Sequence, residues 1–115
     1  MGIYRLYTGD DGQSHIDDLD LETSDELKSE RATTSIGFTT WPAGRFIDWH
    51  PAPRRQYVIL LSGQLEIGLG DGTTRRFGPG DARLVEDTTG QGHTTRVVGD
   101  GPTITAVVPL ADQRL

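Results

Sequence analysis

The feature that most constrains the fold of this chain is the regular recurrence of short glycine turns from Thr33 onward. Six turn signals follow one another, namely WPAG, LSGQ, GDGT, GPGD, TTGQG and GDGP. The segments between them are short and rich in β-branched and aromatic residues, which favour strands. They predict strands at 34–40, 45–50, 56–61, 64–69, 74–77, 82–86, 94–98 and 103–108. Many short strands at even spacing are typical of a sandwich or barrel of two sheets around one core.

Length and composition predict a single all-β domain. The chain has 115 residues, of which 34% are hydrophobic, 15 are glycine and 6 are proline. This balance suits short strands and tight turns better than packed helices. Residues 9–31 are polar and acidic, and TSDELKSER predicts one short helix capped by Thr23 or Ser24. We therefore expect a polar N-terminal extension at 1–33, packed on the barrel or on a partner subunit, and the barrel itself at 34–115.

Charge and hydropathy exclude several classes of partner. The net charge is -6, and the basic pairs Arg54–Arg55 and Arg75–Arg76 are too small to follow a phosphate backbone, so we expect no nucleic acid. No apolar stretch approaches the roughly 20 residues that span a bilayer, so we expect no membrane partner. The start, MGIYRLYTGDDGQSH, has no basic segment followed by an apolar run, so we expect a cytoplasmic protein. The chain has no cysteine and forms neither disulfides nor thiolate metal sites.

The alternation of side chains along a strand indicates which residues share an interior, because successive side chains point to opposite faces. Three predicted strands each place polar and apolar residues on one face. Their candidate interior faces are Phe46, Asp48 and His50; Gln56, Val58 and Leu60; and His93, Thr95 and Val97. If these faces line one cavity, the imidazoles of His50 and His93 converge with the amide of Gln56.

Two motifs carry a resemblance to the cupin superfamily, whose first motif reads G(x)5HxH(x)3,4E(x)6G. In GRFIDWHPAPRRQYVILLSG, His50 follows Gly44 after five residues, Gln56 stands at the glutamate position, and Gly63 closes the motif. Ala52 stands at the position of the second histidine.

The second cupin motif reads G(x)5PxG(x)2H(x)3N, and this chain matches it in part. Gly90 and His93 have the expected interval in TTGQGHTTRV. Thr88 stands at the proline position, Val97 at the asparagine position and Ala82 at that of the first glycine. The turn GPGD at 78–81 is one that cupins often carry there. The resemblance covers about residues 34–108.

The resemblance implies a double-stranded β-helix, or jelly-roll, barrel that binds a divalent metal through three histidines and a carboxylate. Two of these four ligands are replaced here, by Ala52 and Gln56, so the implied metal ligands are His50, His93 and Gln56. The metal would be Zn, Fe, Mn or Ni, held less tightly without an anionic ligand. Either Asp48 or Glu86 could restore a carboxylate.

Other residues have simpler interpretations. His15 lies in the polar N-terminal segment and matches neither motif, so we expect a surface residue. Trp41 and Trp49 either line a ligand pocket or pack at the barrel mouth or at a subunit contact. The second interpretation agrees better with large aromatic residues near strand ends. Arg54 and Arg55 bind an anion at the rim or are solvated in a proline-rich loop.

Two functions remain open from the sequence. In the first, the protein is a metal-dependent cupin enzyme that acts on a small organic molecule through His50, His93 and Gln56; its reaction class and catalytic residues stay unassigned. In the second, the barrel is a metal-free module that binds a small-molecule ligand. Ligand contacts are then expected from Phe46, Asp48, Val58, Leu60 and Val97.

Subunit pairing is a further expectation. Ile59 and Leu61 alternate with the presumed interior residues of their strand and therefore face outward. Similar small cupins are often dimers. We therefore expect a homodimer that pairs sheet to sheet.

Overall fold

The computed structural model describes residues 1–115 and contains ten strands and one short helix. The elements in chain order are β1 (Ile3–Thr8), β2 (Ser14–Leu19), α1 (Asp25–Lys28), β3 (Gly37–Trp41), β4 (Phe46–His50), β5 (Gln56–Ser62), β6 (Gln64–Gly68), β7 (Thr74–Phe77), β8 (Ala82–Val85), β9 (His93–Val98) and β10 (Thr103–Pro109). The structure includes no helix with the length and apolar character needed to cross a membrane.

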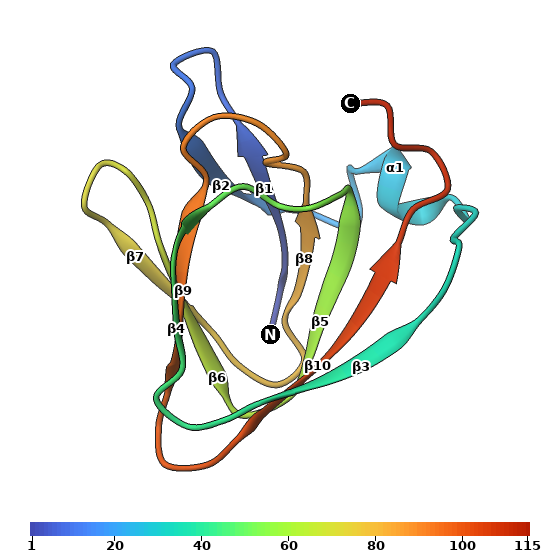
Figure 1. Ribbon diagram of the computed structural model, residues 1–115. Coiled ribbons are helices and arrows are strands. Elements are labelled where there is room, and N and C mark those ends of the chain that lie inside the picture. Colours follow the sequence, from blue (N-terminus) through green and yellow to red (C-terminus); the bar gives the residue numbers. More distant parts are fainter.

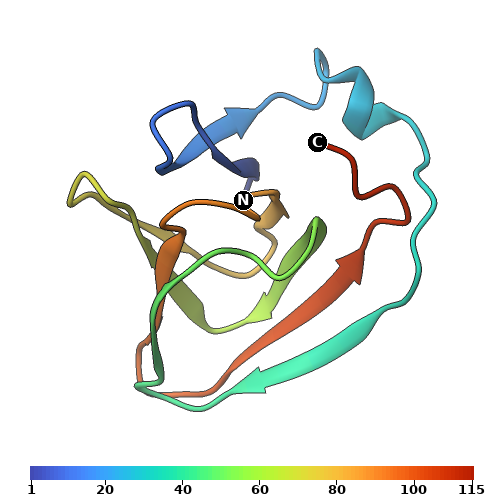
Figure 2. The same ribbon diagram turned by 45° about the horizontal axis from the view of Figure 1, so that its top comes forward.

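The strands form two sheets that face each other across one interior (Figure 1). The larger sheet has the strand order β2-β1-β8-β5-β10-β3, and the smaller has the order β4-β9-β6-β7. Neighbouring strands are antiparallel except β1 and β8, which are parallel. Seen from its upper end, the barrel encloses an interior between these two walls (Figure 2). The fold is therefore an all-β double-stranded β-helix, as the sequence predicts.

All eight strands predicted after residue 33 are present, with bounds that differ by a few residues at most. Two further strands, β1 and β2, lie in the segment 1–33, where the sequence analysis predicted no strand. They form a hairpin that adds to the larger sheet through the parallel pairing of β1 with β8. The sequence SHIDDL of β2 is polar and lacks the usual strand signal. This is because β2 is an edge strand with an exposed outer face, which tolerates charged residues.

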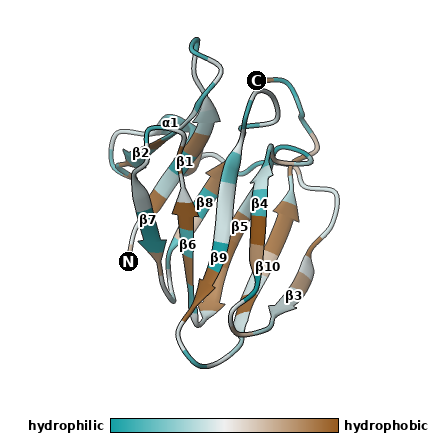
Figure 3. Ribbon diagram, turned by 60° about the vertical axis from the view of Figure 1, so that its left-hand side comes forward, coloured by the Kyte–Doolittle hydropathy of each residue, from teal (hydrophilic) through white to brown (hydrophobic).

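The hydrophobic core lies between the inner faces of the two sheets. Its nine buried members are Leu6, Ala52, Val58, Leu60, Leu65, Ile67, Phe77, Val85 and Val97. Apolar bands run along the central strands of both sheets (Figure 3). Burial of these side chains is the main force that holds the sheets together. The core fills only part of the interior and leaves a cavity between the sheets.

The short helix α1 is present where the sequence predicts it, beside the C-terminal segment (Figure 1). Ser24 is its N-cap residue, but the Ser24 side chain accepts no capping hydrogen bond. An ion pair between Glu26 of α1 and Arg55, at 2.6 Å, connects the helix to the start of β5. This contact helps to fix the segment that links β2 to β3.

Candidate functional site

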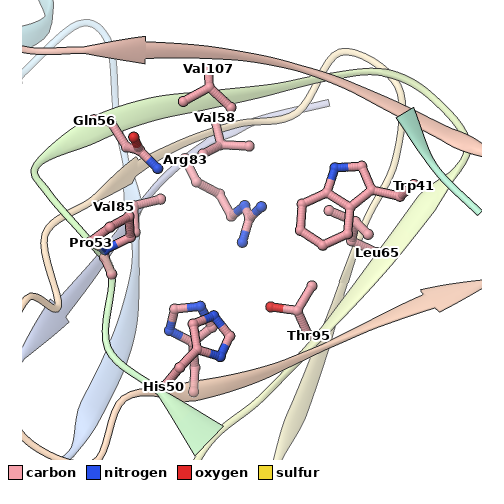
Figure 4. A pocket seen from close by; sticks show the side chains of 12 residues that line it. Trp41, His50, Pro53, Gln56, Val58, Leu65, Arg83, Val85, Thr95 and Val107 are labelled. Carbon is pink, nitrogen blue, oxygen red and sulfur yellow. The ribbon is translucent and has the colours of Figure 1, made fainter. Parts of the chain in front are cut away.

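A cavity of about 240 Å³ lies between the two sheets and is the candidate site (Figure 4). Half of its twelve lining residues are hydrophobic. The lining residues are Trp41, His50, Ala52, Pro53, Gln56, Val58, Leu65, Arg83, Val85, His93, Thr95 and Val107. Both sheets contribute to the lining, so the cavity exists only in the folded barrel.

The structure brings the two motif histidines together. His50 at the end of β4 pairs in register with His93 at the start of β9. Their ring centroids are 4.6 Å apart, and the ring planes are tilted by 57°. The side chains of directly paired residues in an antiparallel sheet share one face. The convergence predicted from alternation therefore occurs, and both imidazoles line the cavity.

A bulge in β4 decides which other residues of that strand face inward. The register between β4 and β9 shifts between Ile47 and His50, so β4 has one residue more than β9 over this stretch. One additional residue reverses the alternation and places Ile47, rather than Phe46, on the face of His50. The prediction that Phe46 and Asp48 contact an interior ligand is wrong for this reason. Phe46 is 44% exposed, with the guanidinium of Arg96 4.6 Å from its ring.

Hydrogen bonds fix the tautomer of each histidine. His50 Nδ1 donates to the backbone carbonyl of Asp48 at 2.7 Å, and His93 Nδ1 donates to Asp87 Oδ2 at 2.5 Å. Because carbonyl and carboxylate oxygens only accept, Nδ1 carries the proton in both rings. Nε2 of each ring makes no hydrogen bond within the protein. The cavity wall therefore presents two imidazole acceptors.

Gly92 allows the loop before β9 to approach the end of β4. Its φ is +77°, in the left-handed region that favours glycine. A Cβ atom at this position would overlap the backbone carbonyl of His50. The glycine immediately before His93 thus sets the close approach that brings His93 against His50.

Gln56, the residue at the motif's carboxylate position, is buried and lines the cavity. Its Oε1 atom accepts a hydrogen bond from Arg54 Nε at 3.1 Å. Since a guanidinium only donates, this bond orients the amide and leaves the NH₂ group on the side of the cavity (Figure 4). Gln56 offers the cavity a hydrogen-bond donor, whereas a metal would need its oxygen.

Arg83 on β8 is the site residue that the sequence analysis missed. It pairs with Val58 of β5, shares its inward face, and extends into the cavity (Figure 4). Its side chain is 5% exposed. It makes no hydrogen bond and no ion pair, and its Nε atom is buried without a partner. Burial lowers the pKa of Arg83 to about 10, although the negative charges of Asp87 and Asp81 oppose this lowering.

The apolar residues predicted to contact a ligand divide into two groups. Val58 lines the cavity, whereas Leu60 and Val97 are buried in the core and do not line it. The alternation predicted their inward orientation correctly, but not how far along the barrel the open space extends. Trp41 forms one wall of the cavity and donates a hydrogen bond from Nε1 to Thr105 Oγ1 at 3.1 Å.

The remaining candidates lie away from the cavity. Glu86 is buried, and its carboxylate accepts hydrogen bonds from Arg5 and from Arg55. It is therefore not free to act as a metal ligand, and Arg55 is buried in this ion pair rather than solvated. Trp49 is exposed. His15 lies on the N-terminal hairpin, as expected for a surface residue, and pairs with Asp11 at 3.0 Å.

The residues of the cavity do not fit a resident divalent metal. No group of three or more histidine, cysteine, aspartate or glutamate side chains is arranged to hold one. His50 and His93 are suitable donors, but Ala52 has no donor atom and Gln56 turns its NH₂ group inward. The charged guanidinium of Arg83 enters the same cavity and repels a cation.

The fold and the cavity define a small double-stranded β-helix barrel whose interior site has apolar walls and a few polar groups. No protein-family model matches the sequence, and no curated protein sequence matches it. Solved structures match, including the cupin domain of Cnp3 from Schizosaccharomyces pombe, which has a TM-score of 0.56 and 16% identity over 86% of this chain and 73% of that one. This chain has the cupin fold.

Two further solved structures agree with this assignment. A cupin domain from Bordetella pertussis gives a TM-score of 0.53 at 15% identity, over 74% of this chain and 88% of that one. A predicted oxalate decarboxylase from Thermotoga maritima gives a TM-score of 0.52 at 14% identity, over 95% of this chain and 93% of that one. Identities this low show that the fold is shared, and the function has to be argued from the site.

Proposed function

We infer that the protein is a metal-free cupin-fold module that binds a small organic molecule inside the barrel. The observation that carries this inference is the position of Arg83, whose guanidinium shares one cavity with the imidazoles of His50 and His93. With a pKa of about 10, Arg83 is positively charged at neutral pH. A divalent cation on the two imidazoles would therefore face a fixed positive charge in the same cavity.

The lining of the cavity supports a small-molecule ligand. Apolar walls from Trp41, Val58 and Leu65 surround a few polar groups, the arrangement that small-molecule sites share. The polar groups include donors, on Gln56 and Arg83, and acceptors, at Nε2 of the two histidines. Such a set can hold one ligand in a defined orientation.

The competing hypothesis is a metal-dependent cupin enzyme that uses Zn, Fe, Mn or Ni. One observation favours it, because both histidines leave Nε2 without a protein partner and hold their protons on Nδ1. A second-sphere carboxylate that fixes the tautomer, as Asp87 does for His93, is common for metal-bound histidines. The donor set nevertheless lacks the third protein ligand that most catalytic metal centres have.

Metal content distinguishes the two hypotheses. We expect protein purified without chelator to contain far less than one equivalent of metal by elemental analysis, and titration with Zn, Fe, Mn and Ni to show no tight site. His93→Ala should leave the metal content unchanged, like the matched control His15→Ala, which removes a surface imidazole. Stoichiometric metal in the unaltered protein that His93→Ala removes and His15→Ala retains would establish the metal-dependent hypothesis instead.

A further inference from the structure

Arg83 is distinctive among the buried charges of this protein because it has no partner. The buried Arg55 donates to Glu86 and to Glu26, so its charge is compensated. By contrast, Arg83 donates no hydrogen bond to the protein, and its Nε atom is buried without a partner. The ring of Phe77 lies 5.1 Å from the guanidinium carbon, and Asp87 and Asp81 act on Arg83 only as negative charges without an ion-pair contact. The five N–H donors of an arginine are normally satisfied when the side chain is buried.

An interior charge without a hydrogen-bonded partner destabilises a folded protein, since the attraction of Asp87 and Asp81 replaces only part of the hydration that Arg83 loses. The position on β8 is compatible with an apolar side chain, because Val58, which pairs with it, and Val85, on the same face of β8, are buried apolar residues. The buried guanidinium therefore indicates that a ligand supplies the hydrogen-bond acceptors that the protein does not.

The groups around Arg83 indicate the polarity and the size of that ligand. The NH₂ group of Gln56 and the hydroxyl of Thr95 lie on the cavity wall and can assist a bound oxygen. Trp41, Val58 and Val107 provide an apolar surface. A volume of about 240 Å³ corresponds to roughly eight water molecules at the volume of liquid water, so the part of the ligand that enters the barrel is small.

The planar fork of a guanidinium matches the two oxygens of a carboxylate. A single guanidinium neutralises one negative charge, and the buried carboxylate of Asp87 nearby makes a doubly charged phosphate less favourable. We propose that the barrel binds a small organic monocarboxylate, with its carboxylate on Arg83 and its apolar part against Trp41 and Val58. This deepens the proposed function and rests on it.

The experiment compares matched probes that differ only in charge. The probes are propionate, isobutyrate and benzoate, their neutral amides, and inorganic phosphate, each titrated at millimolar concentration and followed by tryptophan fluorescence, calorimetry and the thermal midpoint. We expect at least one carboxylate to bind saturably and to raise the midpoint, while its amide and phosphate bind about 10- to 100-fold more weakly, as the loss of a charge-assisted pair predicts.

Two arginine variants test the role of Arg83 directly. Arg83→Met should weaken binding of the carboxylate by about 10- to 100-fold and leave its amide unaffected. Arg83→Lys should recover part of the affinity. Arg76→Met is the matched control, since it removes the same charge from an exposed arginine that pairs with Glu66, and should bind like the unaltered protein.

The possible outcomes separate this inference from the proposed function. Equal binding of amide and carboxylate, tighter binding of phosphate, or unchanged binding in a folded Arg83→Met variant would overturn the carboxylate inference while leaving a metal-free pocket. Absence of saturable binding by all three carboxylates would also overturn it. Stoichiometric metal at the histidines would overturn the proposed function itself.

Discussion

Nδ1 of His93 lies 2.5 Å from Oδ2 of Asp87, a carboxylate that has no exposed surface. The same oxygen accepts a hydrogen bond from Ser14 Oγ at 2.7 Å. Ser14 begins β2 and His93 begins β9, so one carboxylate connects the N-terminal hairpin to the strand that carries an imidazole of the cavity. Asp87 therefore links the stability of the hairpin to the geometry of the site.

Replacement of Asp87 should be strongly destabilising. Asp87→Ala leaves two buried donors unsatisfied and removes the negative charge that offsets the burial of Arg83, so we expect the free energy of unfolding to fall by about 3 kcal/mol. Chemical denaturation measures this value. Asp11→Ala removes an exposed carboxylate that accepts hydrogen bonds from His15 and from the backbone N–H of Gln13, and should lower the free energy of unfolding by about 1 kcal/mol or less. Equal effects of the two substitutions would contradict the structural role of Asp87.

The close approach of the loop at Gly92 to His50 gives a second prediction. Gly92→Ala combines a positive φ with overlap of the His50 backbone, and we expect it to destabilise the protein by about 2 kcal/mol or more and to weaken ligand binding. Gly99→Ala is a matched control, because Gly99 also has a positive φ but open space around it. It should cost only about 1 kcal/mol and leave binding intact. If Gly99→Ala is as harmful as Gly92→Ala, the steric argument fails.

The unpaired charge of Arg83 predicts a gain in stability when it is removed. Arg83→Met should raise the free energy of unfolding by about 2 kcal/mol at neutral pH without added carboxylate. Denaturant titration of both proteins in a buffer free of carboxylates measures the difference. A loss of stability would show that Arg83 has a structural partner.

The increase in the free energy of unfolding caused by Arg83→Met should become smaller as the pH rises above about 10. Burial lowers the pKa of Arg83 to about 10, below that of an arginine in the unfolded chain, so the folded protein loses this proton at a lower pH than the unfolded chain does. The destabilisation by the charge is complete below pH 10 and shrinks as the pH rises above it. Asp87 and Asp81 act against the lowering, and His50 and His93 line the same cavity. A difference between the two proteins that grows above pH 10 would contradict this explanation.

An apolar patch on the outer face of the larger sheet supports the expected homodimer. Phe38 pairs with Ala106, which in turn pairs with Ile59, so these residues share the outer face. Phe38 is 68% exposed, and Leu61, further along β5, is 49% exposed. We expect two copies to pair through this patch. Light scattering should report a dimer at micromolar concentration and a monomer for Leu61→Glu, whereas a monomeric unaltered protein would refute the pairing.

The candidate site was predictable from the sequence only in part. The motif spacing and the alternation in β5 and β9 predicted the convergence of His50 and His93 and the inward side of Val58, because strand periodicity is a local property. Phe46 and Asp48 were assigned to the interior because a bulge is a feature of strand pairing and leaves no clear mark in one strand's sequence.

Arg83 was missed for a related reason. In the strand ARLV of β8, both faces carry apolar residues, so alternation alone does not tell which face lines the interior. The pairing of Arg83 with Val58, a residue already predicted to face inward, decides the question. An arginine in the middle of an otherwise apolar strand is the signal that indicates such a buried charge.

The sequence by itself determined the class of fold, the eight strands after residue 33 and the approach of two imidazoles, because turn residues and side-chain periodicity act over a few positions. Only the tertiary structure decided that the N-terminal segment adds two strands, that Gln56 turns its amide nitrogen inward and that Arg83 shares the cavity with the histidines. Those features depend on which strands pair and in what register, and such pairings join residues far apart in the chain.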